Sequence, residues 1–470
     1  MDQPVVIPSP ALRDRIDLAV ARVGDFLLVR RSAIQAVQWI VVGVYIALVV
    51  VPAVLPLPAS SDHIWSSVSL LARFVFWGVW WPLVLVATML IGRFWCGVFC
   101  PEGTLSQFAS RHGCGGAIPK WVQWPGWPFA AFALTTVYGQ LVSVYQYPQP
   151  ALLVLGGSTL AAMLAGYLWG RDKRVWCRFL CPVNGVFRVL AKLSLFHFRV
   201  DPVAWERSRR SGIKPGPVRC APMVAIKTMR GADQCQMCGL CSGYRGAIRL
   251  ALRSPNHEII NVAGERPDPW ETALIVVGLM GVAVGAFLWS ASPWLVSIKL
   301  WAAKVLLSAG IAWPLTSAAP WWVLTNMPAR NDVLSLLDGA LVLLAIAVVA
   351  LVNGTIIGAA LALATRLCGH WSWRRFHHLA QALIPLAGGG VFLGLSATTV
   401  TLLSQDGFDM RWASPLRALI LIGMAAWTLG LAWSIAARYA PGIRRTLAAA
   451  AVTAAVLPPV GCWCLLFWGW

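Results

Sequence analysis

Repeated apolar runs, each close to twenty residues long and nearly free of charge, constrain this chain more than any other feature. The apolar core of a bilayer is ~30 Å thick and takes about 20 residues of helix to cross. In lipid, only helices and closed barrels satisfy their own backbone hydrogen bonds. Because 58% of the 470 residues are hydrophobic and only 12% are charged, the sequence predicts an all-α polytopic membrane protein.

We expect about nine transmembrane helices, four before and five after one long polar stretch. The uncertain segment is 293–332, which is rich in Trp and Pro but contains Lys299 and Lys304. As an external loop it leaves 32 of the 38 cationic residues on the cytoplasmic side, in agreement with the excess of Lys and Arg in cytoplasmic loops. The expected spans are 36–57, 66–91, 124–145, 151–169, 270–292, 335–365, 379–403, 414–437 and 446–468.

The same charge pattern predicts the domains and the orientation. Residues 171–269 hold 18 Lys and Arg against 7 Asp and Glu, which favours a cytoplasmic location. The net charge of +20 does not indicate a nucleic-acid partner, because the cations lie in the gaps between apolar runs. The partner that the sequence indicates is membrane lipid. The N-terminus is expected in the cytoplasm and the C-terminus outside. The predicted parts are a cytoplasmic segment 1–35, a four-helix membrane domain 36–199, a small cytoplasmic module 200–269 and a C-terminal membrane domain 270–470 with external loop 293–332.

A cysteine motif, W-C-x3-C-P, occurs twice, each time just after an apolar run. Two cysteines four residues apart lie on one face of a helical turn, and the proline disfavours a helical conformation at the second cysteine. Two such pairs predict one shared metal centre, for which an iron–sulfur centre, copper and a redox-active dithiol pair all suit soft thiols. Nearby cations, among them Arg93 and Arg174, predict thiols of low pKa. The candidate metal ligands are Cys96, Cys100, Cys177 and Cys181.

A second cysteine group lies in the predicted module. Its C-x2-C-x2-C spacing is the core of a bacterial-type 4Fe–4S ligand run. Arg245 stands where the fourth cysteine of that run is expected, so Cys220 is the candidate fourth ligand. A zinc site on the same four thiols is the alternative. The candidate 4Fe–4S ligands are Cys220, Cys235, Cys238 and Cys241, with nearby basic residues Arg219, Lys227, Arg230, Arg245 and Arg249 expected to offset the cluster's negative charge.

The two C-x3-C-P motifs, followed by a ferredoxin-like module, resemble the NapH/NosR/CcoG group of membrane-bound polyferredoxins. The resemblance covers roughly residues 36–260 and does not extend to 270–470. It implies a protein of the bacterial inner membrane that passes electrons between the quinone pool and a redox partner protein, or reduces copper during oxidase assembly. The chain departs from that group because it has one incomplete ferredoxin motif, where two complete motifs are usual.

The leading hypothesis is therefore membrane electron transfer, as an electron-transfer subunit or an oxidoreductase, with quinol as a candidate partner. The first alternative is a metal-handling assembly factor such as a cupric reductase. A transporter with a structural zinc module is a third class, but few ionisable residues lie deep in a span; Arg73 and Arg417 are near predicted span ends. His370, His377 and His378 predict a basic surface patch or a contact with quinol headgroups rather than haem ligation.

Overall fold

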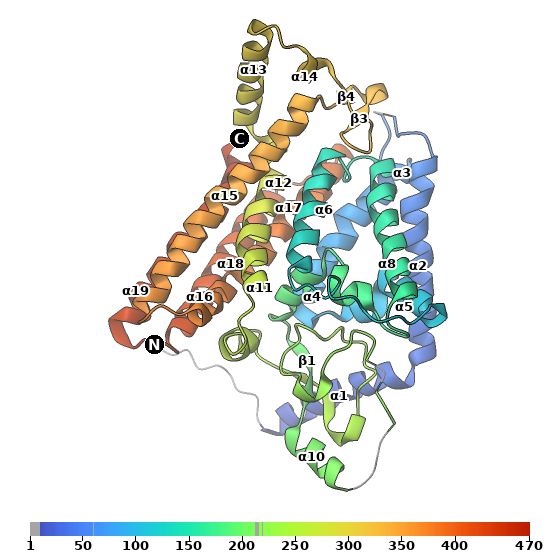
Figure 1. Ribbon diagram of the computed structural model, residues 1–470, viewed down its shortest axis with the longest axis vertical. Helices are drawn as coiled ribbons and strands as arrows, with labels where there is room; N and C mark the ends of the chain where they lie inside the picture. The colour runs from blue at the N-terminus through green and yellow to red at the C-terminus, as the bar shows by residue number, and fades with distance from the viewer. Residues whose placement is uncertain (1–9, 60, 212–215, 219) are drawn as a thin grey trace.

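The computed structural model of the protein describes residues 10–59, 61–211, 216–218 and 220–470. Long helices form a bundle, and a small module with β1 (Phe196–Val200) and α10 (Pro202–Arg210) lies at one end of it (Figure 1). Helix α1 (Pro10–Val29) runs beside that module. Two parts of the sequence predictions, residues 1–9 of the N-terminal segment and Arg219, lie outside the described residues.

Eight helices in the described part of the chain are long and apolar enough to cross a membrane. Several of these segments include a π-helical stretch. The chain is thus mostly helical and polytopic, as predicted. The eight are α2 (Arg31–Val54), α3–η1–α4 (Val68–Ile91), α7–η3–α8 (Pro148–Leu168), α11–η8–α12–η9 (Pro269–Ala291), α15 (Leu336–Leu367), α16–η11–α17 (Trp373–Gln405), α18 (Ala413–Ala436) and α19–η12 (Gly442–Gly469).

The ninth expected span, 124–145, contains a shorter helix than predicted. Helix α6 (Trp127–Leu141) has 15 residues, which corresponds to about 22 Å and is less than the ~30 Å of a bilayer core. Pro128 occupies its first turn. Beyond its end the chain turns tightly, with Ser143 at a φ of 52°. The helix in this segment is therefore shorter than the predicted span, because local turn geometry ends it, and the count of nine spans stays a prediction.

The Trp-rich segment 293–332 lies at the end of the bundle opposite the module (Figure 1). It forms α13 (Pro293–Ser308), α14 (Trp313–Thr316) and a hairpin of β3 (Asn326–Met327) with β4 (Asp332–Val333). The Thr325 amide donates to the Leu141 carbonyl at 2.8 Å, which ties the segment to the end of α6. Trp294 contacts the terminal Trp470 with ring centroids 5.3 Å apart, so this segment and the C-terminus share one end.

The module is built on two antiparallel strands, an exception to the predicted all-α class. Strand β1 pairs with β2 (Ile248–Leu252) in the register Phe196↔Leu252 and Phe198↔Leu250. Phe198 and Leu250 are buried together with Cys235 and Met237. Helix α1 covers the module closely, since a methyl group at Gly239 would lie 2.5 Å from Cβ of Leu27. The loops that hold the cysteines are thus fixed between the sheet and α1.

The C-terminal half of the bundle holds the module through a turn at residues 258–264. Arg374 Nε donates to the Gly264 carbonyl at 2.6 Å, and Arg438 Nη1 donates to the Ile260 carbonyl at 2.8 Å. His378 bridges the Ile259 carbonyl (2.8 Å) and the Tyr439 hydroxyl (2.6 Å). These contacts fix the module against the bundle.

His378 and its neighbour do not lie where the sequence predicted. His377 and His378 are buried, at 8% and 2% exposure, and His377 pairs with the Thr272 hydroxyl at 2.9 Å. The prediction of a histidine surface patch is therefore wrong for these two residues. Each is placed by packing between helices that are distant in sequence, and each already has a hydrogen-bond partner within the chain.

Candidate functional site

The two W-C-x3-C-P motifs adopt nearly the same backbone. Each begins with a π-helical turn, η2 (Trp95–Phe99) or η4 (Trp176–Leu180), closed by a 2.9 Å hydrogen bond from the second cysteine's amide to the tryptophan carbonyl. The second cysteine then leaves the helical region, with φ and ψ of −68° and 117° at Cys100 and −57° and 124° at Cys181. The predicted effect of the following proline is confirmed in both copies.

The four thiols of the two motifs face one cavity of about 220 Å³ within the bundle. The motifs meet closely, since a methyl group at Gly103 would lie 3.5 Å from Sγ of Cys177. Two of the four residues, Cys96 and Cys177, are buried at 8% and 7% exposure. The structure therefore brings Cys96, Cys100, Cys177 and Cys181 together, as the repeat predicted, while metal binding by them stays a prediction.

Glu102 is the acidic group of this cavity. Its carboxylate accepts a hydrogen bond from Ser158 Oγ at 2.7 Å and another from Trp176 Nε1 at 3.0 Å. Tyr45 also lines the cavity, and its hydroxyl pairs with Thr159 Oγ1 at 2.8 Å. The rest of the wall is largely apolar, and its aromatic residues include Trp77, Trp80, Trp81, Trp95, Phe132, Tyr145, Phe187 and Phe287. The thiols thus lie at a largely apolar site.

Burial raises the pKa of three of these thiols. It raises the pKa of the Cys177 thiol to about 12, although Arg174 and Arg93 act to lower that pKa. Burial likewise raises the pKa of the Cys100 and Cys181 thiols well above the usual range. In the protein without a bound metal, desolvation of these thiolates outweighs the attraction of nearby cations, while the low pKa expected of thiols in a metal centre or a redox dithiol pair stays a prediction.

The second cysteine group surrounds a smaller cavity of about 20 Å³ in the module. Its lining includes all four predicted ligands, Cys220, Cys235, Cys238 and Cys241. The chain winds around it through left-handed positions between the cysteines, at Met237 (φ 54°) and Gly239 (φ 75°). The amides of Val224 and Met237 donate to the Sγ atoms of Cys220 and Cys235, both at 3.4 Å. Such N–H···S contacts stabilise a thiolate that carries a metal.

The two cysteine groups are in contact through the first motif. A methyl group at Gly97 would lie 2.0 Å from the carbonyl oxygen of Gln236 and 2.9 Å from the amide nitrogen of Cys238. Gly97 is adjacent to Cys96, and Gln236 is adjacent to Cys235. One backbone-to-backbone contact therefore joins the loop of one four-cysteine group to the loop of the other.

Two buried arginines strengthen this junction. Arg174, 4% exposed, donates through Nη1 to the Cys96 carbonyl at 2.6 Å and to Gln236 Oε1 at 3.3 Å. Arg93, 2% exposed, donates to the Asp233 carbonyl at 3.0 Å. Sequence reasoning noted both as cations near the thiols but missed this bridging role. A signal was present, since each arginine stands two residues before the tryptophan of its motif.

The basic residues predicted near the module's cysteines have other partners. Lys227 pairs with Glu206 at 3.2 Å and Arg230 with Glu265 at 2.5 Å. The Arg245 guanidinium lies 5.5 Å from the centre of the Trp205 ring. Burial raises the pKa of the Cys220 thiol, and among the cations that oppose this rise are Lys173 and Arg178.

The donor chemistry of both cavities fits an iron–sulfur cofactor. Each presents four sulfur donors, which are the ligands such clusters take, and each is shielded by apolar side chains. Within residues 10–59, 61–211, 216–218 and 220–470, no three His, Cys, Asp or Glu side chains converge closely enough to bind a single metal ion, so the four thiols of each group are spaced more widely than the ligands of a one-metal site. Cys114 and Cys464 are exposed and lie outside both groups.

Comparison with known proteins gives one family match. Residues 74–125 and 151–201 each match the family model described as a 4Fe–4S binding domain. The first stretch holds Cys96 and Cys100, the second holds Cys177 and Cys181, and the module's four cysteines lie outside both. No curated protein and no solved structure matches the chain. The duplicated match identifies a 4Fe–4S cluster as a cofactor of this iron–sulfur protein.

Proposed function

We propose that this chain is a membrane-bound electron-transfer protein that relays electrons between the quinone pool, or a cytoplasmic donor, and a redox partner protein. The observation that carries the proposal is the contact of Gly97 with Gln236 and Cys238, which places two four-cysteine groups side by side. A 4Fe–4S cluster supplies one-electron oxidation and reduction. The protein's own part is to hold two such sites at a fixed separation and to exclude water from them.

Two buried arginines between the cysteine groups suit a relay of electrons. Arg93 and Arg174 connect the two loops by hydrogen bonds and place positive charge between two groups that become anionic when thiolates bind metal. Both guanidinium groups are buried, so their field is screened less than that of surface cations. They therefore stabilise added negative charge, and with it the reduced form of either site.

The aromatic cavity supports quinol as the partner in the membrane. A planar carrier dissolved in the bilayer needs an apolar pocket with a few polar groups. The cavity around Trp77, Trp81 and Phe187 offers such walls, with Glu102 and Tyr45 as polar groups close to the cysteines. Our proposal therefore assigns the quinone-side reaction to this cavity and the soluble-side contact to the module.

Gly97→Ala tests the contact that carries the proposal. The added methyl group collides with backbone atoms of Gln236 and Cys238, so the loops must separate, at a typical cost of about 1–3 kcal/mol. We expect a lower thermal stability. We also expect the cluster proposed for the module to be reduced more slowly after anaerobic protein is mixed with a quinol analogue, as followed by the EPR signal of that cluster. Gly43→Ala is the control, since that position in α2 has open space. Equal reduction rates in both variants would contradict a relay through this contact.

The orientation within the membrane is a second part of the proposal. We infer a bacterial inner-membrane protein with residues 200–269 and the N-terminus in the cytoplasm, supported by the excess of cations around the module. The segment 293–332 and the C-terminus lie at the opposite end (Figure 1) and are then outside. Reporter fusions at Arg374 and after Trp470 are expected to give cytoplasmic and external signals, respectively. An external signal at Arg374 would overturn this topology.

A further inference from the structure

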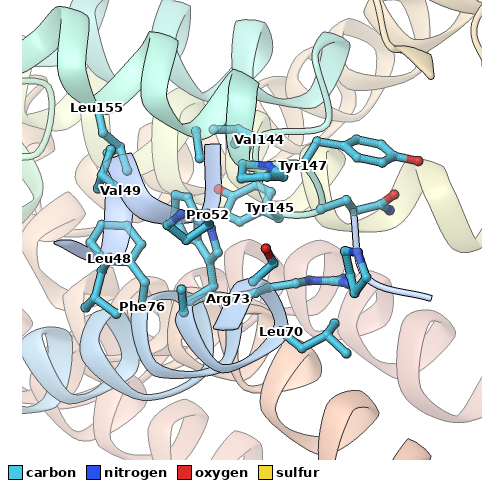
Figure 2. A pocket seen from close by; sticks show the side chains of 17 residues that line it. Leu48, Val49, Pro52, Leu70, Arg73, Phe76, Val144, Tyr145, Tyr147 and Leu155 are labelled. Carbon is cyan, nitrogen blue, oxygen red and sulfur yellow. The ribbon is translucent and has the colours of Figure 1, made fainter. Parts of the chain in front are cut away.

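A separate cavity of about 70 Å³ lies near the start of the span that leads to the first cysteine motif. Its walls come from α2, from α3 (Val68–Arg73) and from the turn at residues 144–148 (Figure 2). Arg73 is separated from Cys96 by 23 residues, and the helical part of that path alone is about 27 Å long. Arg73 therefore lies far from the cysteines, although its cavity adjoins the aromatic end of the cysteine cavity, with which it shares Phe76, Trp77, Val144, Tyr145 and Leu155.

Arg73 is the one cation among the residues that line this cavity. Figure 2 shows its side chain extended between Tyr145 and Leu70. Among the described residues, its buried Nε has no hydrogen-bond partner. The nearby Tyr147 hydroxyl is already committed, since it donates to Asp332 at 2.6 Å. Arg73 is half-buried, and an ionisable residue in a membrane segment is a functional-site candidate unless a protein partner explains it.

Two further polar groups face the same space. Ser69 lies one helical turn before Arg73, on the same face, and is 9% exposed. Gln146, an exposed residue, also lines the cavity. A cavity needs about 10–15 Å³ of such space to admit one water, so the volume of about 70 Å³ leaves room for a small polar group. Guanidinium, hydroxyl and amide together form a donor set that suits an oxyanion.

We propose that this cavity binds a phosphate-type oxyanion, with Arg73 as the principal ligand and Ser69 and Gln146 as further donors. The oxyanion has two possible sources, a phospholipid headgroup and free inorganic phosphate. The apolar wall formed by Leu48 and Val49 suits the acyl chain of the first source. This inference is independent of the electron-transfer proposal, because none of these residues belongs to either cysteine group.

The test uses full-length protein that has been purified in detergent and stripped of lipid. Calorimetric titration with inorganic phosphate forms one arm, and titration with dioctanoyl phosphatidylglycerol forms the other. Arg73→Gln is expected to weaken binding at least about tenfold, since it removes charge-assisted hydrogen bonds. Arg73→Lys should retain part of the affinity, because the charge remains while the planar donor fork is lost.

Arg417→Gln is the matched control. Arg417 lies at the start of α18, at the same end of the bundle, but it already has partners: its guanidinium lies 4.3 Å from the centre of the Phe467 ring and donates to the Ser396 carbonyl at 3.4 Å. We expect its affinity for either ligand to equal that of the wild type. Binding of lipid, of phosphate or of both, with loss in Arg73→Gln, supports the proposal and identifies the source.

The proposal is overturned if neither ligand binds, or if Arg73→Gln binds as tightly as the wild type. Iron content and thermal stability of each variant show whether the fold is intact. If Arg73→Gln does not fold, the comparison of Arg73→Lys with the wild type decides, and equal affinity there counts against an arginine-specific site. Electron-transfer rates play no part in this readout, so failure here and failure of the proposed function remain distinguishable.

Discussion

Replacing Cys100 by serine is expected to remove one complete metal centre, and replacing Cys181 is expected to remove the same one. Each motif offers two thiols, whereas a stable tetrahedral or cubane site takes about four ligands. All four thiols line one cavity in the bundle. The loss of any one ligand therefore leaves the remaining three with an open position, and electron transfer should fall with the lost signal.

The measurement is iron, sulfide, copper and zinc content together with EPR spectra of protein purified without oxygen. For a shared centre, the double variant Cys100→Ser with Cys181→Ser is no worse than either single variant. Cys114→Ser is the control, because Cys114 is an exposed cysteine outside both groups. Independent, additive losses would indicate two separate sites. Unchanged metal content would indicate a dithiol pair or plain packing, and a loss of copper alone would favour the cupric reductase alternative.

Replacing Cys238 by serine is expected to abolish a second, different EPR signal while the first remains. Cys238 lines the module's cavity together with Cys220, Cys235 and Cys241. Cys220→Ser should abolish the same signal, because Cys220 is the only candidate fourth ligand in that cavity. Since the family match does not include these residues, this pair of variants directly tests whether the module carries its own cluster.

Cys368→Ser is the control for the module variants. Cys368 is also a buried cysteine, at 3% exposure, but it follows α15 and lines neither cavity. We expect unchanged iron and sulfide in that variant. Stoichiometric zinc without iron, in protein prepared without oxygen, would replace the 4Fe–4S assignment in the module by a structural zinc site.

Local sequence was enough to predict the backbone of the cysteine motifs. At Cys100 and Cys181, the following proline disfavours a helical conformation, so the effect is encoded by adjacent residues. The long spans were also predictable, because uniform hydropathy over about twenty residues decides them. The exception was α6, where Pro128 and the turn at Ser143 shorten the helix without changing the hydropathy of the segment.

Features that depend on contacts between distant residues could not be predicted in the same way. Arg174 lies 62 residues from its partner Gln236, and nothing in the local pattern pairs them. The direction of the Cys177 pKa shift depends on burial, which a sequence does not report for a short cysteine loop. The burial of His378 required knowledge of how α16 meets the turn at residues 258–264.

The hydrogen bonds between the C-terminal helices and the module form late during synthesis of the chain. The turn at residues 258–264 is held by Arg374, His378 and Arg438, which leave the ribosome more than one hundred residues after it. Until they arrive, the module contacts only earlier parts of the chain, through α1 and the first cysteine motif. We therefore expect a chain truncated before residue 374 to have a less firmly held module than the full chain, and to retain less iron there if the module carries a cluster.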